Sequence, residues 1–328
     1  MSRDHCSVAS NGFLMTVTAS TARPTAEARS RSGPIAWLMS PDRRGPLLIA
    51  PAIATLLIVN IFPLMWSFGL SFFEYKANRI TPPVFKGLAN YADLFTDPEI
   101  WARFQNTAII VVGSVALQLV VGFFLALLFA QEFPLRRYLL MLVLSPMMLS
   151  LSAVGVFFKL FYDPTLGFIS RIISMFTQDT FVILSTPTRA IIAIVVADAW
   201  MWSPFVMLLV LAGLVSVPKY LYEAAEIDRA GPWRRFRTIT FPYIKSLLLL
   251  ALLFRTIETF KIFDIVYLLT EGGPGSSTET ASVYVYRLAF QFFRTSQASA
   301  LGYVMLFAVI VLTSLYLYGI QSRKEVEI

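Results

Sequence analysis

The residues best suited to specific chemistry lie in the charged stretch 222–242, YEAAEIDRAGPWRRFRTITFP, which separates two long apolar runs. Glu223 precedes two small residues, Ala224 and Ala225, in a short helical pattern. Small side chains let another surface approach closely, and the flanking charges would fix its register. The pattern indicates protein docking, although residue types alone also fit an ordinary basic loop beside a membrane.

Local residue preferences indicate where the docking helix begins and ends. Ser216 is a candidate N-cap, and Pro218 suits the first turn. Gly231 followed by Pro232 is expected to stop the helix, because Gly favours a C-terminal cap and Pro cannot continue a helix. A second amphipathic piece follows, with one face formed by Trp233, Phe236, Thr240 and Tyr243.

Enzymatic chemistry has few candidates in this sequence. The chain has one Cys and one His, Cys6 and His5, so it offers no disulfide framework, Cys/His zinc cluster or usual nucleophile–His pair. It contains no G-x-x-x-x-G-K-[ST] pattern, so it is not expected to bind ATP through a P-loop. No catalytic residue, metal site or cofactor is therefore predicted for this chain.

The composition predicts a membrane protein. Hydrophobic residues make up 57% of the 328 and charged residues only 14%, which departs from a typical soluble domain. Apolar runs of about 20 residues are long enough to cross the hydrocarbon core as helices. The predicted fold is an all-α polytopic membrane protein with six transmembrane helices in a lipid bilayer. The expected spans are residues 46–73, 107–130, 138–161, 189–215, 246–269 and 300–320.

The distribution of charge predicts the orientation of these spans. Six spans place both termini on one side, together with Arg136, Arg137 and the basic loop 216–245, whereas the opposite loops are richer in acids. The positive-inside rule then makes both termini and that loop cytoplasmic. Residues 1–45, rich in Ser, Thr, Ala and Arg, are predicted to be a disordered tail, followed by the transmembrane domain 46–320 and a short tail, 321–328. The net charge of +7 is thus explained without nucleic acid.

Polar residues within the expected spans are candidates for a transport path, because ionisable groups there are costly and usually face a cavity or a partner. The fourth span contains Asp198 and Trp202, and the fifth contains Arg255, Glu258, Thr259, Lys261 and Asp264. Aromatic faces and hydroxyl partners would suit a sugar. An equally weighted alternative is that these residues serve structural interhelical pairing, such as Arg255 with Glu258 at i,i+3 spacing.

The charged loop resembles the EAA loop of ABC-importer permeases, the membrane subunits of binding-protein-dependent uptake systems. The resemblance rests on the pattern EAA-xx-D-x-A followed by F-xx-I-xx-P. The usual Gly after the Asp is Arg229 here, which departs from the family pattern. The matching residues are Glu223, Ala224, Ala225, Asp228, Ala230, Phe236, Ile239 and Pro242.

Two further signatures are similar to the carbohydrate-uptake class, and to its maltose-type first permease in particular. One is T-x-GGP, beginning at Thr270, and the other is GLANYADLF followed by DPEIWARFQNT over residues 87–107. The resemblance implies a bacterial inner-membrane permease that works with a second permease, two copies of a cytoplasmic ABC ATPase and an extracytoplasmic sugar-binding protein. ATP and Mg²⁺ would bind the ATPase, which would dock on the EAA loop. The resemblance also implies substrate contacts on the fourth and fifth spans, at Asp198, Trp202, Arg255, Glu258 and Thr259.

Other functions remain open on sequence alone. A stand-alone ion-coupled secondary transporter is one alternative, although neither an internal repeat nor a broken helix is clear in the sequence. A membrane anchor for a signalling complex would leave the charges within the spans unexplained. Within the importer class, the expected substrate is a disaccharide such as maltose or trehalose, with a polyol or glycerol phosphate as alternatives.

Overall fold

The computed structural model describes residues 41–177 and 182–324, and it divides the chain into two compact units, Met1–Ile61 and Phe62–Ile328. In the first unit, α2 (Pro41–Leu56) continues into the π-helix η1 (Leu57–Ile61). Most of the predicted tail 1–45 lies outside the described residues, but its last five residues are helical. At the other end, residues 321–324 of the predicted tail belong to the last helix.

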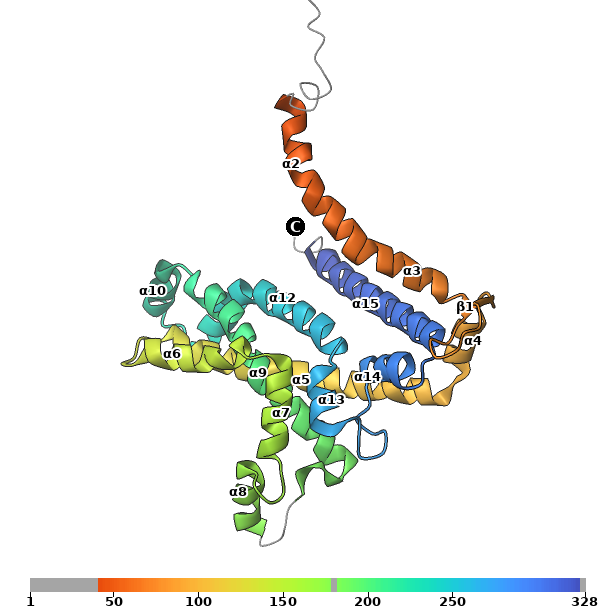
Figure 1. Ribbon diagram of the computed structural model, residues 1–328. Helices are drawn as coiled ribbons and strands as arrows, with labels where there is room; N and C mark the ends of the chain where they lie inside the picture. Colours follow the sequence, from red (N-terminus) through yellow and green to blue (C-terminus); the bar gives the residue numbers. More distant parts are fainter. Residues whose placement is uncertain (1–40, 178–181, 325–328) are drawn as a thin grey trace, which may run out of the picture. The chain divides into compact units, whose positions relative to one another are not determined.

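The second unit is helical apart from one two-stranded antiparallel hairpin, in which Phe73 pairs with Phe85 and Glu74 with Val84 (Figure 1). Its elements, in chain order, are α3 (Phe62–Leu70), β1 (Phe73–Glu74), β2 (Val84–Phe85), α4 (Ala89–Thr96), α5 (Pro98–Ala130), α6 (Arg136–Leu144), η2 (Ser145–Met148), α7 (Leu151–Phe161), α8 (Phe168–Thr177), η3 (Ile183–Ser185), α9 (Pro187–Val215), α10 (Lys219–Ile227), α11 (Pro232–Arg235), η4 (Phe236–Thr240), α12 (Phe241–Phe260), α13 (Asp264–Thr270), α14 (Ala281–Tyr286), η5 (Arg287–Gln291) and α15 (Thr295–Lys324).

Within the part of the chain that the structure describes, five helical stretches are long and apolar enough to cross a membrane, and a bent pair of helices brings the number to six if the pair is one span. These stretches confirm the predicted all-α polytopic class. The side of the membrane on which the termini lie stays a prediction. The stretches are Ile49–Leu70, Pro98–Ala130, Pro187–Val215, Pro232–Phe260 and Thr295–Gly319, and the bent pair is Arg136–Met148 with Leu151–Phe161.

Three of the predicted spans differ most clearly from the helices in the structure. The second begins at Pro98 rather than at residue 107, because the Asp97 carboxylate caps the helix by accepting a hydrogen bond from the Glu99 amide at 2.9 Å. The third bends by 101° between Met148 and Leu151. The fifth ends at Phe260, nine residues early, and resumes as α13 at Asp264. Two apolar runs that the sequence analysis interpreted as continuous are therefore broken helices.

The core that positions the polar residues is formed by α5, α9 and α12. Gly122 of α5 lies so close to α9 that a Cβ added there would stand 2.6 Å from the Val206 Cβ and 2.7 Å from the Ser203 carbonyl oxygen. Close helix approach of this kind is typical of membrane helices with small residues at the contact. The tight packing brings polar side chains of the three helices within hydrogen-bonding distance of one another.

Candidate functional site

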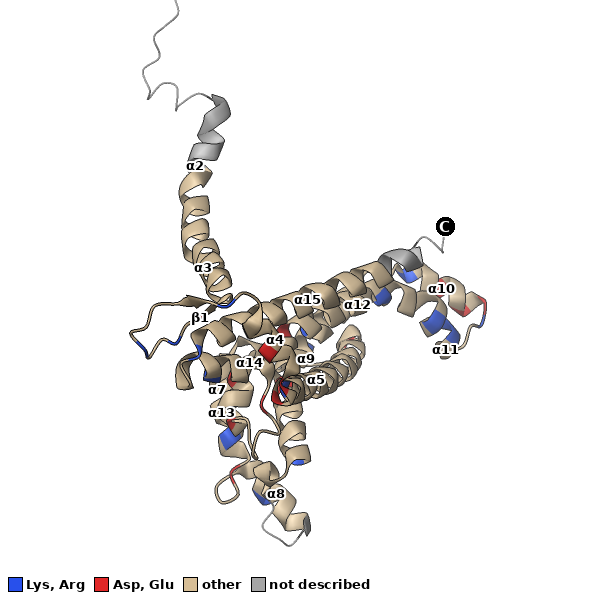
Figure 2. Ribbon diagram, turned by 90° about the vertical axis from the view of Figure 1, so that its right-hand side faces the viewer, with Lys and Arg blue, Asp and Glu red and all other residues tan. Residues whose placement is uncertain are grey.

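The charged loop between α9 and α12 folds into a helical hairpin made of α10, α11 and η4. Figure 2 shows acidic and basic residues gathered on α10 and α11. Its first helix begins after Pro218, which is the N-cap. Ser216 was predicted in that role, but it is the C-cap of α9, and its hydroxyl donates to the Gly213 carbonyl at 2.7 Å. The prediction of a short helix carrying Glu223, Ala224 and Ala225 is confirmed.

The end of α10 has the geometry of a Schellman motif. The Ala230 amide donates to the Ala225 carbonyl at 2.9 Å, and the Arg229 amide donates to the Glu226 carbonyl at 3.0 Å. Arg229 has a φ of 51°, the left-handed region that favours glycine. The stop predicted at Gly231 is therefore wrong: the helix ends at Ile227, and Gly231 is the N-cap of α11. Arg229, which stands where the family pattern has glycine, is thus the residue of this turn that adopts a positive φ.

We expect Arg229→Gly to stabilise the loop by about 1 kcal/mol, because glycine adopts the left-handed conformation without the steric cost of a Cβ. Thermal unfolding of the purified variant, compared with wild type, measures the effect. Ala230→Gly is the matched control, since Ala230 lies next to Arg229 but is not among the residues with positive φ. A destabilised Arg229→Gly variant would contradict the prediction.

Side-chain contacts hold the two halves of the hairpin together. Arg235 donates through Nε to the Ala230 carbonyl at 2.8 Å and lies 2.9 Å from the Glu226 carboxylate. The Tyr222 and Thr240 hydroxyls are 2.9 Å apart. Phe236 packs its ring against Phe123 of α5, which fixes the hairpin to the core. The hairpin is thus a preformed surface element attached to a membrane-spanning helix.

The predicted coupling residues divide into two sets by exposure. One set supports the hairpin and is partly buried: Ala225, Ala230, Phe236 and Ile239. The other set is exposed: Glu223, Ala224, Asp228, Arg229 and Pro242. Among the described residues no hydrogen bond or ion pair to the Glu223 carboxylate is present. The exposed set therefore leaves an unpaired acid beside a small residue, as a docking surface requires.

A polar network links α5, α9 and α12 inside the core. The Gln118 amide donates to Asp198 Oδ2 at 2.7 Å and accepts from Arg255 Nε at 2.8 Å. Arg255 Nη2 donates to Thr259 Oγ1 at 3.0 Å and lies 3.6 Å from Asp198 Oδ1. The Arg255 guanidinium also covers the Trp202 ring, 4.5 Å from its centroid. Asp198 and Arg255 are each only 2% exposed, so this is a buried ion pair with hydrogen bonds on both partners.

All five predicted substrate-path residues line one cavity of about 150 Å³: Asp198, Trp202, Arg255, Glu258 and Thr259. The break between α12 and α13 supplies further lining through Ile262 and Phe263. Arg255 does form an interhelical ion pair, as the structural alternative predicted, but its partner is Asp198 and not Glu258. Arg255 pairs with Asp198, and Glu258 pairs with Lys261 at 3.0 Å near the surface. Lys261 and Asp264, predicted within a span, lie at the break, where the helix leaves room for polar groups.

Gln118, which connects the two charged partners, was not predicted from the sequence. A neutral amide within the long apolar run of α5 was the available signal, because such a group also needs hydrogen-bond partners in lipid. Glu279, a buried carboxylate in the loop after α13, was not predicted either. No group of His, Cys, Asp and Glu side chains suited to a metal occurs in residues 41–177 and 182–324.

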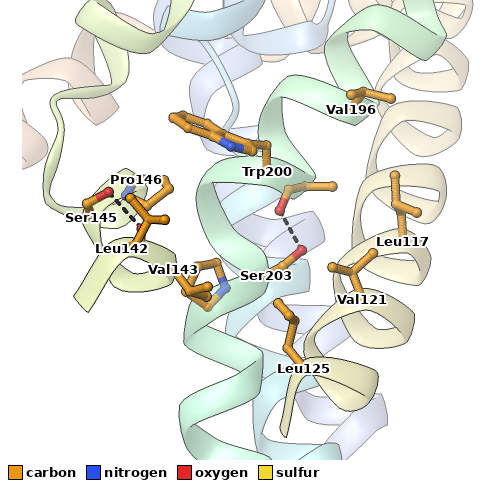
Figure 3. Close-up of a pocket in the computed structure, with 12 residues that line it drawn as sticks. Leu117, Val121, Leu125, Leu142, Val143, Ser145, Pro146, Val196, Trp200 and Ser203 are labelled. Atoms are coloured by element: carbon orange, nitrogen blue, oxygen red, sulfur yellow. Dashed lines mark hydrogen bonds between the residues drawn. The ribbon is translucent and has the colours of Figure 1, made fainter. Parts of the chain in front are cut away.

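A second, larger cavity of about 490 Å³ lies between α5, α6, η2 and α9 (Figure 3). Leucine, valine and proline side chains form most of its wall, with Trp200 at one side. Its two hydroxyls are already engaged, since Ser203 donates to the Ala199 carbonyl at 2.5 Å and Ser145 to the Leu142 carbonyl at 2.8 Å. Apart from the Trp200 indole, this cavity offers a mainly apolar wall, so it is less suited to a sugar than the smaller polar one.

Comparison with known proteins finds a family that matches the chain, relatives of similar sequence and a solved structure of similar fold. Residues 118–326 match the family described as binding-protein-dependent transport system inner membrane component. The chain is 35% identical to the sulfoquinovosyl glycerol transport system permease protein of Agrobacterium fabrum, over 88% of this chain and 94% of that protein. It is 34% identical to the trehalose/maltose transport system permease protein of Thermococcus litoralis, over 86% and 95%. In fold it resembles a chain of a bacterial ABC transporter that imports the acidic polysaccharide alginate, with a TM-score of 0.73 and 24% identity over 86% of this chain and 96% of that one.

Proposed function

The chain belongs to the family of binding-protein-dependent transport system inner membrane components, and we propose that it forms half of the path of an ATP-driven importer for a disaccharide such as maltose or trehalose. It is a sugar ABC-transport permease of the multi-pass inner-membrane type. A stand-alone ion-coupled transporter is not supported, because the relatives are subunits of transport systems. The observation that carries the proposal is the cavity in which five predicted substrate-path residues meet.

The cavity offers what recognition of a sugar requires. The partly buried indole of Trp202 can stack on the C–H face of a pyranose, and the exposed Glu258 and Lys261 side chains can exchange hydrogen bonds with hydroxyls. The cavity of about 150 Å³ accommodates part of a disaccharide, which supports the proposal that a second permease completes the path. The trehalose/maltose relative supports a disaccharide substrate. The sulfoquinovosyl glycerol relative favours a glycoside of glycerol as the second candidate.

Energy for transport is proposed to come from two copies of a cytoplasmic ABC ATPase, each docked on the α10–α11 hairpin of one permease. Support comes from the exposed, unpaired Glu223 and from the attachment of the hairpin to α5 through Phe236. ATPase closure would move the hairpin as a rigid body and so rearrange the helices that line the cavity. An extracytoplasmic binding protein is proposed to deliver the sugar, as the family description implies.

The test of the proposed function is purification of the assembled complex from cells that express this chain with its genomic neighbours. The complex, in proteoliposomes with its binding protein, is screened with trehalose, maltose, sulfoquinovosyl glycerol and glycerol phosphate. We expect ATPase stimulation and uptake with a disaccharide. Stimulation by none of these compounds, or uptake without any ATPase in the complex, would contradict the proposal.

Within that complex we expect Trp202→Ala to raise the half-saturating sugar concentration about 2- to 13-fold, because loss of aromatic stacking removes roughly 0.5–1.5 kcal/mol of contact energy. Thr259→Val should change the preference among sugars by altering the hydrogen bonding of Arg255 at the cavity wall. Uptake of each sugar and basal ATPase rate are the measurements. Trp200→Ala is the matched control, since Trp200 lines the apolar cavity instead. Equal loss of assembled complex in all three variants would show a packing role only.

A further inference from the structure

The loop between α13 and α14, residues 271–280, contains a buried carboxylate that the proposed transport path does not use. Glu279 is 1% exposed, and its two carboxylate oxygens contact two arginines from distant elements. Arg103 Nε of α5 lies 2.8 Å from Oε2, and Arg287 Nη1 of η5 lies 2.7 Å from Oε1. A buried charge persists only when it is paired in this way. We call Glu279, Arg103 and Arg287 the clasp.

The clasp fixes the loop to the helices on both sides of it. Arg287 donates through Nη2 to the Glu271 carbonyl at 2.6 Å, at the start of the loop. Asn106 of α5 donates to the carbonyls of Ser276 and Glu279 at 3.1 and 3.3 Å. The glycine-rich sequence fits this packing: Gly272 has a φ of 85°, and a Cβ there would lie 3.2 Å from the Glu279 Cβ. The Gly-Gly-Pro sequence at residues 272–274 is thus part of a tertiary anchor.

The residue after Glu279 connects the clasp to the transport cavity. Thr280 Oγ1 donates to the Ile262 carbonyl at 3.2 Å and also caps α14 by accepting from the Val283 amide at 3.4 Å. Ile262 lies in the break between α12 and α13 and lines the cavity with Phe263. Carbonyls at a helix break lack a partner within their own helix, so a hydroxyl from another element is needed to hold one in place.

We propose that Glu279 is a positioning residue for transport: by binding both arginines it places Thr280 against the break at Ile262, and so holds one wall of the sugar cavity. This inference rests on the proposed function for its effect on uptake, but its structural step is independent of that function. The negative charge is essential, because two guanidinium groups meet at one buried side chain. A glutamine there would turn at most one acceptor oxygen toward them, leaving Arg287 without its counter-charge and Arg103 with only the exposed Glu99.

The first experiment compares Glu279→Gln with Glu99→Gln in the assembled complex. Glu99 contacts the same Arg103 at 3.2 Å, but it is exposed, so its loss should change little. For Glu279→Gln we expect about a tenfold rise in the half-saturating sugar concentration, with basal ATPase rate unchanged. Uptake by Glu279→Gln that matches the Glu99→Gln control would overturn the proposal.

A second pair of variants tests the route through Thr280 and covers the case in which Glu279→Gln fails to assemble. Thr280→Val removes the hydroxyl bonded to Ile262, whereas Thr280→Ser keeps it. Hydrogen exchange of the solubilised complex should be about tenfold faster at residues 261–263 in Thr280→Val, and unchanged in Thr280→Ser. Faster exchange confined to residues 281–283 would report only a lost helix cap and would overturn the proposal. If wild type transports no sugar while the exchange result holds, the proposed function fails and the positioning role of the clasp stands.

Discussion

Replacing Arg255 by methionine should destabilise the protein by about 3–5 kcal/mol, the usual cost of removing one partner from a buried ion pair. Asp198, 2% exposed, would keep its hydrogen bond from Gln118 but lose the only cation within 4 Å of it among the described residues. Gln118 and Thr259 would each lose a hydrogen bond as well. The apparent melting temperature of the purified chain in detergent, together with the yield of monodisperse protein, measures the loss.

Two controls test whether the loss of stability comes from leaving a buried charge unpaired rather than from removing any positive charge. Lys261→Met removes a cation whose partner Glu258 lies at the surface, so it should cost less than about 1 kcal/mol. Asp198→Asn combined with Arg255→Met removes both charges and should recover a large part of the lost stability, because no unpaired ion remains in the core. If Arg255→Met and Lys261→Met both melted at the wild-type temperature, the Asp198–Arg255 pair would contribute nothing to stability.

The helices that cross the membrane could be predicted from the sequence because their signal is local. An apolar run of sufficient length is a property of consecutive residues, and the fourth span matches α9 to within two residues. The two breaks could not be predicted in the same way. Around residues 145–151 the chain stays mainly apolar, so hydropathy alone does not distinguish a bend from a straight helix. The local signs were Pro146 at the first break and the charged Lys261 and Asp264 at the second, and these residue types also occur in unbroken helices.

The charged residues of the candidate site could be predicted from the sequence, but the contacts between them could not. Asp198 and Arg255 stand out because ionised groups are rare in apolar runs. Their pairing depends on how α9 and α12 pack. Glu258, three residues after Arg255 on the same helix, was the partner suggested by local spacing, but it pairs with Lys261 instead. Arg103 and Glu279 are 176 residues apart in the chain, so their contact exists only once the fold is formed. Sequence reasoning could therefore name residues of the site but not the network that holds them.

The hairpin of α10 and α11 shows how an exposed charge can be distinguished from a structural one. Glu226 is committed to Arg235 within the hairpin, at 2.9 Å. Glu223 lies one turn earlier on the same helix and makes no hydrogen bond or ion pair within residues 41–177 and 182–324. The neighbouring Ala224 is exposed and small, so a partner can approach the backbone beside the carboxylate. A free acid on a rigid, close-approach surface is the arrangement expected of a docking contact.

We therefore expect Glu223→Lys to abolish sugar uptake while membrane insertion and the melting temperature stay at wild-type values. A hydrogen bond to a charged group at an interface is worth roughly 1.5–3 kcal/mol, so its loss alone weakens docking about 10- to 150-fold, and the reversed charge adds repulsion. Copurification of the proposed ATPase and sugar-stimulated ATP hydrolysis are the measurements. Glu132→Lys, in the exposed turn between α5 and α6 that is predicted on the same side of the membrane, is the matched control and should leave uptake intact. Normal uptake by Glu223→Lys would show that this face of α10 does not dock the ATPase, because a reversed charge at a real contact cannot leave transport unchanged.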